Sequence, residues 1–292
     1  MFFDEHTLLD IRLHMLDPYV DYFVISESTY THSGKSKPLW FDINQYKAFA
    51  HKIRHIVVDQ PPPDLYGPSE GPKDANRKAI LNACKRENYQ RNALYDGIND
   101  AEPNDIVMIS DLDEIPQLES ICFSSIREKI ILFRQIYCYY KLNWQLPNTP
   151  WYGSRACKKK NLKSPQWLRN IKSKRYHPLL RPDTWFKNNR YYDIKIIKDG
   201  GWHFAYAKTA EAIKYKLVSY LHCIDFDNKA ISVGKLDEYI KDKKPIYDLS
   251  VDQRQDKTAS SSQLQIIPHH ALPQHIRENQ TKYQDLIATE DQ

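Results

Sequence analysis

The sequence lacks the cysteine patterns that mark disulfide-rich proteins and zinc sites. Its five cysteines are odd in number and far apart, and no two of them form a C-x-x-C pair. A disulfide framework and a cysteine-based zinc site are therefore both disfavoured. The same pattern is typical of proteins that work in a reducing compartment.

Long hydrophobic runs are also missing. Nowhere does the chain hold about 18 consecutive apolar residues, which is close to what a helix needs to cross a bilayer. An amphipathic pattern begins within the first ten residues, where a signal peptide would show an apolar stretch instead. We therefore expect no signal peptide, no membrane span and a cytoplasmic location.

The chain also has only a small excess of positive over negative charge. A net charge of +5 over 292 residues is low for a protein that coats nucleic acid, so no nucleic-acid partner is expected. Residues 155–175 are the exception, because this stretch holds basic residues and no acid. The basic residues are Arg155, Lys158, Lys159, Lys160, Lys163, Arg169, Lys172, Lys174 and Arg175. Such a run is either a solvated face or a place that holds phosphate or an acidic partner.

Apolar runs that alternate with helical patterns predict an α/β fold. Strand patterns cover residues 21–27, 52–59 and 105–110, and helical patterns cover residues 8–16 and 73–97. Strand, helix and strand in this order favour parallel pairing, so we expect a mixed, mostly parallel sheet flanked by helices.

Two further stretches complete the predicted organisation. Asp199-Gly200-Gly201 is expected to turn the strand at 191–197 into a hairpin with residues 202–204. Residues 1–247 are expected to form the main domain. Residues 248–292 are expected to form a polar linker and a C-terminal helical segment that docks on that domain.

Three carboxylates follow one predicted strand within four residues. The strand at 105–110 leads into Asp111-Leu112-Asp113-Glu114-Ile115-Pro116. Open α/β sheets bind ligands beyond the carboxyl ends of their strands, so these acids would stand at a crevice. Acids so close together repel one another unless a cation joins them, and oxygen ligands of this kind suit Mg²⁺ or Mn²⁺. The alternative is an acidic loop that simply follows a strand.

Other polar residues are candidates for the same site. Glu27 closes the strand at 21–27 and is expected at the same edge of the sheet. His203, in the short aromatic strand Trp202-His203-Phe204, is either a ligand or a core histidine. Arg91, in the second predicted helix, either pairs with an anion or is exposed to solvent.

Several stretches together resemble glycosyltransferase family 17. They are Phe2-Phe3-Asp4-Glu5, Leu8-Leu9-Asp10-Ile11-Arg12-Leu13, Asp21-Tyr22-Phe23-Val24-Ile25-Ser26-Glu27-Ser28 followed by Thr31, Gly34, Lys35 and Lys37-Pro38-Leu39, Ser110-Asp111-Leu112-Asp113-Glu114-Ile115-Pro116, and Gly200-Gly201-Trp202-His203-Phe204. These matches fall in the family's order and span most of the chain. The resemblance implies a GT-A-type nucleotide-sugar-binding fold, with residues 1–247 as the catalytic domain.

The same resemblance implies a reaction and its cofactors. It implies a metal-dependent, inverting transfer of a sugar, such as N-acetylglucosamine, from a UDP-sugar donor to a glycan acceptor, with Mn²⁺ or Mg²⁺. Asp111 and Asp113 would then hold the metal, with Asp113 as the direct ligand and Asp111 facing the ribose or a metal-bound water. His203 would supply a further ligand. Glu27 would meet the uracil or ribose, and Arg91 the diphosphate.

Inversion needs one base that deprotonates the acceptor hydroxyl. Glu211 is the first choice and Glu114 the second. An acceptor groove is predicted where aromatic residues cluster, unless these residues belong to the core. The cluster comprises Tyr137, Tyr139, Trp144, Trp151 and Tyr152.

Two other classes of function use the same residues. A metal-dependent phosphoesterase or nuclease would use the acids, with the basic run at 155–175 holding nucleic acid. The sequence lacks a second cluster of histidine and aspartate for another metal. The other alternative is a non-catalytic carbohydrate-binding protein, which would leave the pair Asp111 and Asp113 hard to explain.

Overall fold

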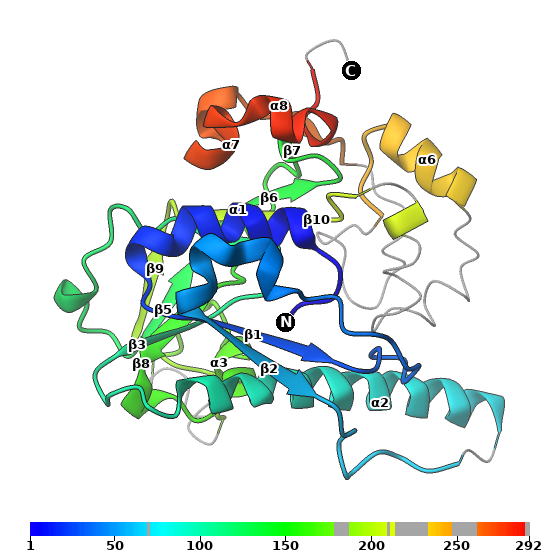
Figure 1. The fold of residues 1–292 in the computed structure, drawn as a ribbon, viewed down its shortest axis with the longest axis vertical. Helices are drawn as coiled ribbons and strands as arrows, with labels where there is room; N and C mark the ends of the chain where they lie inside the picture. Colours follow the sequence, from blue (N-terminus) through cyan, green and yellow to red (C-terminus); the bar gives the residue numbers. More distant parts are fainter. Residues whose placement is uncertain (69–70, 178–186, 209–210, 214–232, 247–261, 290–292) are drawn as a thin grey trace.

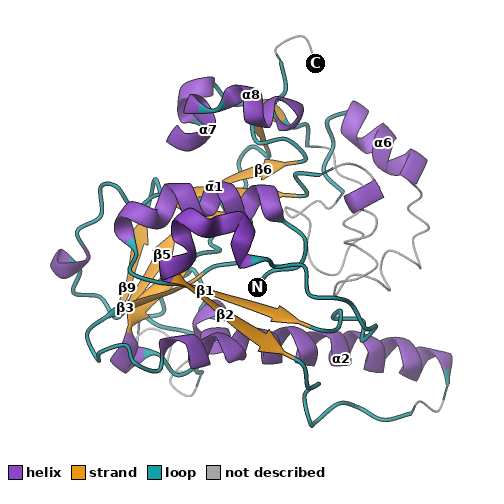
Figure 2. Ribbon diagram, in the orientation of Figure 1, coloured by secondary structure: helices purple, strands orange, loops and turns teal. Residues whose placement is uncertain are grey.

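A computed structural model describes the chain apart from residues 69–70, 178–186, 209–210, 214–232, 247–261 and 290–292 (Figure 1). The α-helices are α1 (His6–Leu16), α2 (Pro72–Asn92), α3 (Pro165–Arg169), α6 (Val233–Lys241), α7 (Gln274–Glu278) and α8 (Gln280–Tyr283). The strands are β1 (Phe23–Ser28), β2 (Ile53–Val58), β3 (Ile106–Ile109), β4 (Glu114–Pro116), β5 (Ile130–Phe133), β6 (Ile136–Tyr139), β7 (Trp144–Gln145), β8 (Arg155–Lys158), β9 (Ile194–Ile197), β10 (Gly201–Ala205) and β11 (Gln265–Ile266). The fold is mixed α/β, as Figure 2 shows.

The described strands form three sheets, of which one is a parallel pair and two are mixed. Their orders are β1-β2, β11-β7-β6-β10-β4 and β3-β8-β5-β9. The pairs β1–β2, β10–β6 and β5–β9 are parallel, whereas β10–β4, β11–β7, β3–β8, β5–β8 and β6–β7 are antiparallel. The prediction of a mostly parallel sheet is therefore wrong. Parallel neighbours need long crossovers, and the described part of residues 117–200 holds one α-helix, the five-residue α3.

The first two strands lie between helical segments, as their alternating side chains require. Phe23 and Ile25 of β1 pack in one hydrophobic cluster with Leu9 and Leu13 of α1. Val24 points to the other face, where it packs with Leu94 in the 3₁₀ helix η3 (Ala93–Ile98) that follows α2. Strand β1 is thereby covered on both faces, and α1 and α2 lie on opposite sides of it (Figure 1).

The predicted hairpin around Gly200 and Gly201 is also wrong. Strand β9 pairs with β5, whereas β10 pairs with β4 and β6 in another sheet. At these two glycines the chain passes from one sheet to the other, in close contact with neighbouring backbone. A Cβ on Gly200 would lie 2.7 Å from the backbone nitrogen of Arg134, and one on Gly201 would lie 2.2 Å from the carbonyl oxygen of Ile115. Gly201 also has φ of +106°, a conformation that side chains rarely adopt.

The end of the chain packs against its beginning. Leu272 and Ile276 share a hydrophobic cluster with Leu8 and Ile11 of α1. The Asp10 carboxylate accepts hydrogen bonds from Lys282 at 2.6 Å and from the Tyr283 hydroxyl at 2.7 Å. The predicted linker falls largely on residues 247–261, outside the described residues, so the domain boundary at residue 247 stays a prediction.

The described residues include four of the five cysteines and no membrane-spanning helix. Cys84, Cys122, Cys138 and Cys157 are free thiols, and Cys223 lies outside the described residues. Within the described ranges, no helix is long and apolar enough to span a bilayer.

Candidate functional site

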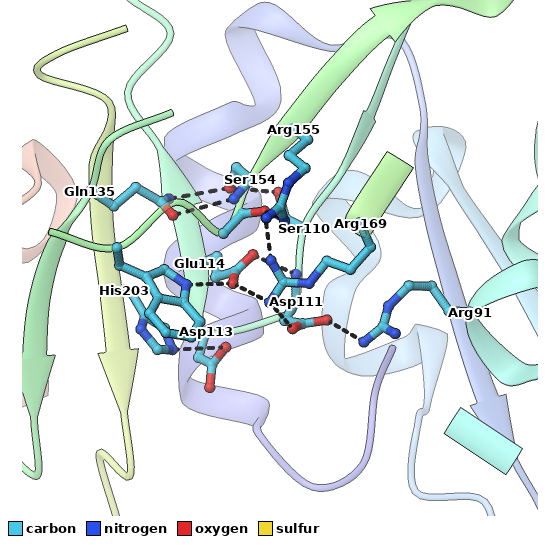
Figure 3. A network of polar contacts seen from close by, with 12 residues as sticks. Arg91, Ser110, Asp111, Asp113, Glu114, Gln135, Ser154, Arg155, Arg169 and His203 are labelled. Carbon is cyan, nitrogen blue, oxygen red and sulfur yellow. Dashed lines mark hydrogen bonds and ion pairs between the residues drawn. The ribbon is translucent and has the colours of Figure 1, made fainter. Parts of the chain in front are cut away.

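Two acids of the sequence motif, Asp111 and Asp113, lie in the turn between β3 and β4, and the third, Glu114, begins β4. The turn is closed by a hydrogen bond of 3.1 Å from the Glu114 nitrogen to the Asp111 carbonyl oxygen. Strand β4 then pairs with β10, so that Glu114 lies opposite His203. On its other side His203 is opposite Tyr137 of β6. The two sheet pairings therefore bring the acidic turn and the histidine strand together (Figure 3).

Glu114 is fully buried and held by three donors. Its Oε2 accepts a hydrogen bond from the Asp111 backbone nitrogen at 2.9 Å. Its Oε1 accepts from Trp151 Nε1 at 2.7 Å and from Arg169 Nη2 at 2.8 Å. A Cβ on Gly153 would lie 1.9 Å from Oε1, so this carboxylate fits only against a glycine. Both oxygens are thus engaged, which gives Glu114 a structural part and leaves its role as a base a prediction.

Asp111 lies between two guanidinium groups, as Figure 3 shows. Its Oδ1 accepts a hydrogen bond from Arg91 at 3.0 Å, and its Oδ2 accepts one from Arg169 at 2.7 Å. Burial by itself would raise the pKa of Asp111. The charges of Arg169 and Arg91 outweigh burial and hold this pKa well below its usual range. Asp111 is therefore an ionised carboxylate.

Asp113 and His203 form a second polar pair beside this one. His203 Nε2 lies 3.7 Å from Asp113 Oδ1. The imidazole stacks on both Tyr137 and Trp151, with ring centroids at 4.6 and 4.5 Å, and these two rings also contact each other at 5.3 Å. The Nδ1 atom of His203 is buried and has no hydrogen-bond partner among the residues that the structure describes. The ring is therefore held in place by stacking, with Nε2 directed at the carboxylate.

This pair fits a divalent cation. Two neighbouring ligand atoms on one octahedral ion, each at about 2.1 Å, lie about 3 Å apart, so a movement of less than about 1 Å from the observed 3.7 Å would bring both atoms onto one ion. Mg²⁺ is commonly held by one or two carboxylates, with water and substrate phosphates completing its shell. Mn²⁺ accepts imidazole more readily. Asp113 and His203 are thus the candidate ligands, while Asp111 is bound by two arginines.

A cleft of about 560 Å³ adjoins these groups. It is lined by Cys84, Glu87, Asn88, Arg91, Pro150, Trp151, Tyr152, Arg155, Gln166, Arg169 and Asn170. Burial and the neighbouring charge of Arg169 lower the pKa of Arg155 to about 10, which still leaves it protonated at neutral pH. Three guanidinium groups around one cleft suit a ligand with phosphate groups.

Trp151 connects the cleft to the acid–histidine pair. It lines the cleft, its ring stacks on His203, and its Nε1 donates to Glu114. Tyr152 lines the cleft as well. The remaining residues of the predicted acceptor groove, Tyr137, Tyr139 and Trp144, are buried in a hydrophobic cluster, so for them the core interpretation holds.

Glu27 has a local set of partners. Its oxygens accept hydrogen bonds from Lys37 Nζ at 2.9 Å and from the backbone nitrogens of Trp40 and Phe41 at 2.7 and 3.1 Å. Its side chain is fully buried. A contact with a nucleotide would require these bonds to be rearranged, and that role stays a prediction.

Glu211 stands apart from the acidic turn. It is exposed, at the start of the helical residues 211–213. Within the described part of the chain, the structure joins it to the acids by no hydrogen bond or ion pair. Its role as the base stays a prediction.

Arg169 and Gly153 are the site residues that sequence reasoning did not single out. Arg169 belongs to the acid-free basic run, so that run is only partly a solvated face. The composition did contain a signal for this pairing. A basic run without acids and an acidic cluster without basic residues in the same chain suggest that the two pair. No local pattern identified Arg169 as the partner.

Comparison with known proteins agrees with the family resemblance. The model of glycosyltransferase family 17 matches residues 1–290. A human protein, beta-1,4-mannosyl-glycoprotein 4-beta-N-acetylglucosaminyltransferase, is 28% identical over 233 residues, which cover 74% of this chain and 41% of the human protein. The mouse protein of the same name is 27% identical over 233 residues, covering 74% of this chain and 40% of its own length. The chain thus spans about two fifths of these relatives. No solved structure matches significantly.

The ion pairs of Asp111 predict a pH-dependent contribution to stability. Its pKa in the folded protein is lowered from 3.8, so the contribution is complete above that value and is lost as the pH falls further. The Asp111→Asn variant should therefore be less stable than the wild type near neutral pH, and the difference should shrink below about pH 4.

Urea unfolding between about pH 2 and 7 measures this difference. Asp59→Asn, at an exposed carboxyl outside the site, is the matched control. A destabilisation by Asp111→Asn that stays constant over the whole range would show that its charge does not matter.

Proposed function

This chain belongs to glycosyltransferase family 17, and we propose that it transfers a sugar from a nucleotide-sugar donor to a glycan acceptor. The proposed donor is UDP-N-acetylglucosamine, and the proposed reaction is metal-dependent and inverting, on a GT-A-type fold. The observation that carries the proposal is the adjacency of two parts of the site. The pair Asp113 and His203 and the arginine-lined cleft share Trp151 as a common wall.

The cleft supplies the groups that a nucleoside diphosphate needs. Arg91 and Arg169 both line it and place positive charge there, and Arg169 has the more exposed side chain of the two for contact with phosphate oxygens. Trp151 and Tyr152 offer flat faces for a sugar or a base. A divalent cation at Asp113 and His203 would neutralise charge on the departing diphosphate.

The acceptor hydroxyl needs a base, and the two candidates differ in exposure. Glu114 is buried with both oxygens engaged, whereas Glu211 is exposed. This difference supports Glu211 over Glu114.

The phosphoesterase alternative has less support. Two-metal hydrolysis requires ions about 3.5–4 Å apart, each with its own ligands. The structure does gather Asp10, His14 and His275, but none of these lines the cleft. The Asp10 carboxylate is also engaged by Lys282 and Tyr283.

Replacement of the proposed metal ligand tests the reaction most simply. Asp113→Asn should lower the release of UDP from UDP-N-acetylglucosamine with Mn²⁺ and a glycan acceptor by more than about 100-fold, since it removes a direct ligand. The melting temperature should stay close to that of the wild type, because Asp113 is at the surface of the site. A panel of other nucleotide sugars, read by thermal shift and by nucleoside diphosphate release, identifies the donor.

Asp59→Asn again serves as the control and should retain wild-type turnover. Full activity of Asp113→Asn, or of the wild type in excess EDTA, would overturn metal dependence. Binding of no nucleotide sugar at all would overturn the transferase function itself.

The second ligand can be tested without losing its packing. His203→Phe keeps an aromatic ring against Tyr137 and Trp151 but removes the nitrogens. We expect the Mn²⁺ concentration for half-maximal rate to rise at least about tenfold, with a small change in melting temperature. A lower melting temperature with an unchanged metal titration would show that His203 is a core residue only.

A further inference from the structure

One guanidinium nitrogen of Arg169 serves two carboxylates at the centre of the site. Its Nη2 lies 2.7 Å from Asp111 Oδ2 and 2.8 Å from Glu114 Oε1. The same side chain lines the arginine-lined cleft. We propose that Arg169 is an exchangeable counter-cation. It pairs with these acids in the donor-free protein, and it pairs with the diphosphate instead when metal and nucleotide bind. This inference rests on the proposed function.

The partners of Arg169 can lose it without being left unpaired. The Gly153 carbonyl oxygen, which accepts from Arg169 Nη1 at 2.7 Å, keeps its hydrogen bond from Arg155. Glu114 keeps the hydrogen bonds from Trp151 Nε1 and from the Asp111 backbone nitrogen. Asp111 keeps its ion pair with Arg91. Departure of Arg169 therefore leaves each buried carboxylate with a donor, which avoids the large penalty of an unpaired buried charge.

Arg91 is less suited to such an exchange. Its side chain is 3% exposed, against 15% for Arg169. It is bound to Glu87 one helical turn earlier in α2, at 2.7 Å, and also to Gln166 of α3. Arg169 stands at the last residue of the short α3, with its side chain at the cleft. Arg91 thus acts as the fixed cation and Arg169 as the one that changes partner.

The local charges favour joint binding of metal and nucleotide. Arg169 is bound to both Asp111 and Glu114, and Asp113 lies in the same turn. A dication at Asp113 and His203 alone would therefore be repelled by Arg169 across the shared acid Asp111. The diphosphate of a nucleotide sugar carries two negative charges, which offset the dication and offer Arg169 new oxygens. Each ligand therefore makes the site more favourable for the other.

This exchange predicts opposite effects of one substitution on two affinities. Arg169→Met should bind Mn²⁺ alone at least about threefold more tightly, because a competing cation has been removed. The same variant, saturated with Mn²⁺, should bind UDP at least about tenfold more weakly, because a charge-assisted hydrogen bond has been lost. Isothermal titration calorimetry of the full chain with MnCl₂ alone, and with UDP in the presence of MnCl₂, measures both affinities.

Arg155→Met is the matched control. Arg155 lines the same cleft, but its hydrogen bonds go to the carbonyl oxygens of Gly153 and Ile171. This variant should weaken UDP binding without tightening Mn²⁺ binding. Arg169→Lys keeps the charge and should change the Mn²⁺ affinity by less than about twofold. It provides the test if Arg169→Met does not fold.

The outcomes separate this inference from the function on which it rests. Wild-type protein that binds neither Mn²⁺ nor UDP overturns both. Normal binding by the wild type, with Mn²⁺ affinity unchanged or weakened in Arg169→Met, overturns the exchange alone. Should Arg169→Met not fold, a more than twofold tightening of Mn²⁺ in Arg169→Lys overturns it as well, because the charge is still present.

Discussion

The turn between β3 and β4, together with Glu114 at the start of β4, places three carboxylates so close together that the fold must bring positive charge to them. Arg169 supplies that charge by joining Asp111 to Glu114, and Arg91 joins Asp111 from the other side. The two arginines come from α3 and α2, which lie far apart in the sequence and pack against each other. The absence of a side chain at Gly153 leaves room for the buried carboxylate of Glu114. The arrangement of the site follows from this one electrostatic requirement.

Local patterns predicted the first half of the chain well. The helix α1 and the strands β1 and β2 follow from apolar periodicity, and the acids were expected at the end of the strand that became β3. After residue 110 the strands expected at 191–197 and 202–204 are present as β9 and β10, but their pairing was predicted wrongly. Strand pairing there depends on contacts distant in sequence, such as β10 lying between β4 and β6. The pair Gly200 and Gly201 was interpreted as a tight turn, although it serves the close passage of two backbones.

The candidate site was predicted in part, for a similar reason. The sequence argument that clustered acids need a cation was sound, but it named only a metal. The structure provides Arg169 as a further cation, and its separation of 58 positions from Asp111 hides this pairing from any local pattern. At Glu27 the partner that was missed is close in sequence. Lys37, only ten positions away, binds the Glu27 carboxylate in the interior, and a contact of Glu27 with a nucleotide stays a prediction.

The central claim is that the pair Asp113 and His203 and the arginine-lined cleft form one donor site. Crystals grown with Mn²⁺ and UDP test it directly through the anomalous scattering of manganese. The account predicts one manganese peak between the Asp113 carboxylate and His203 Nε2, with the diphosphate against Arg91 and Arg169, and with Arg169 turned away from Glu114. A peak at Asp10, His14 and His275 instead, or UDP bound outside the cleft with Arg169 still bridging the two acids, would contradict it.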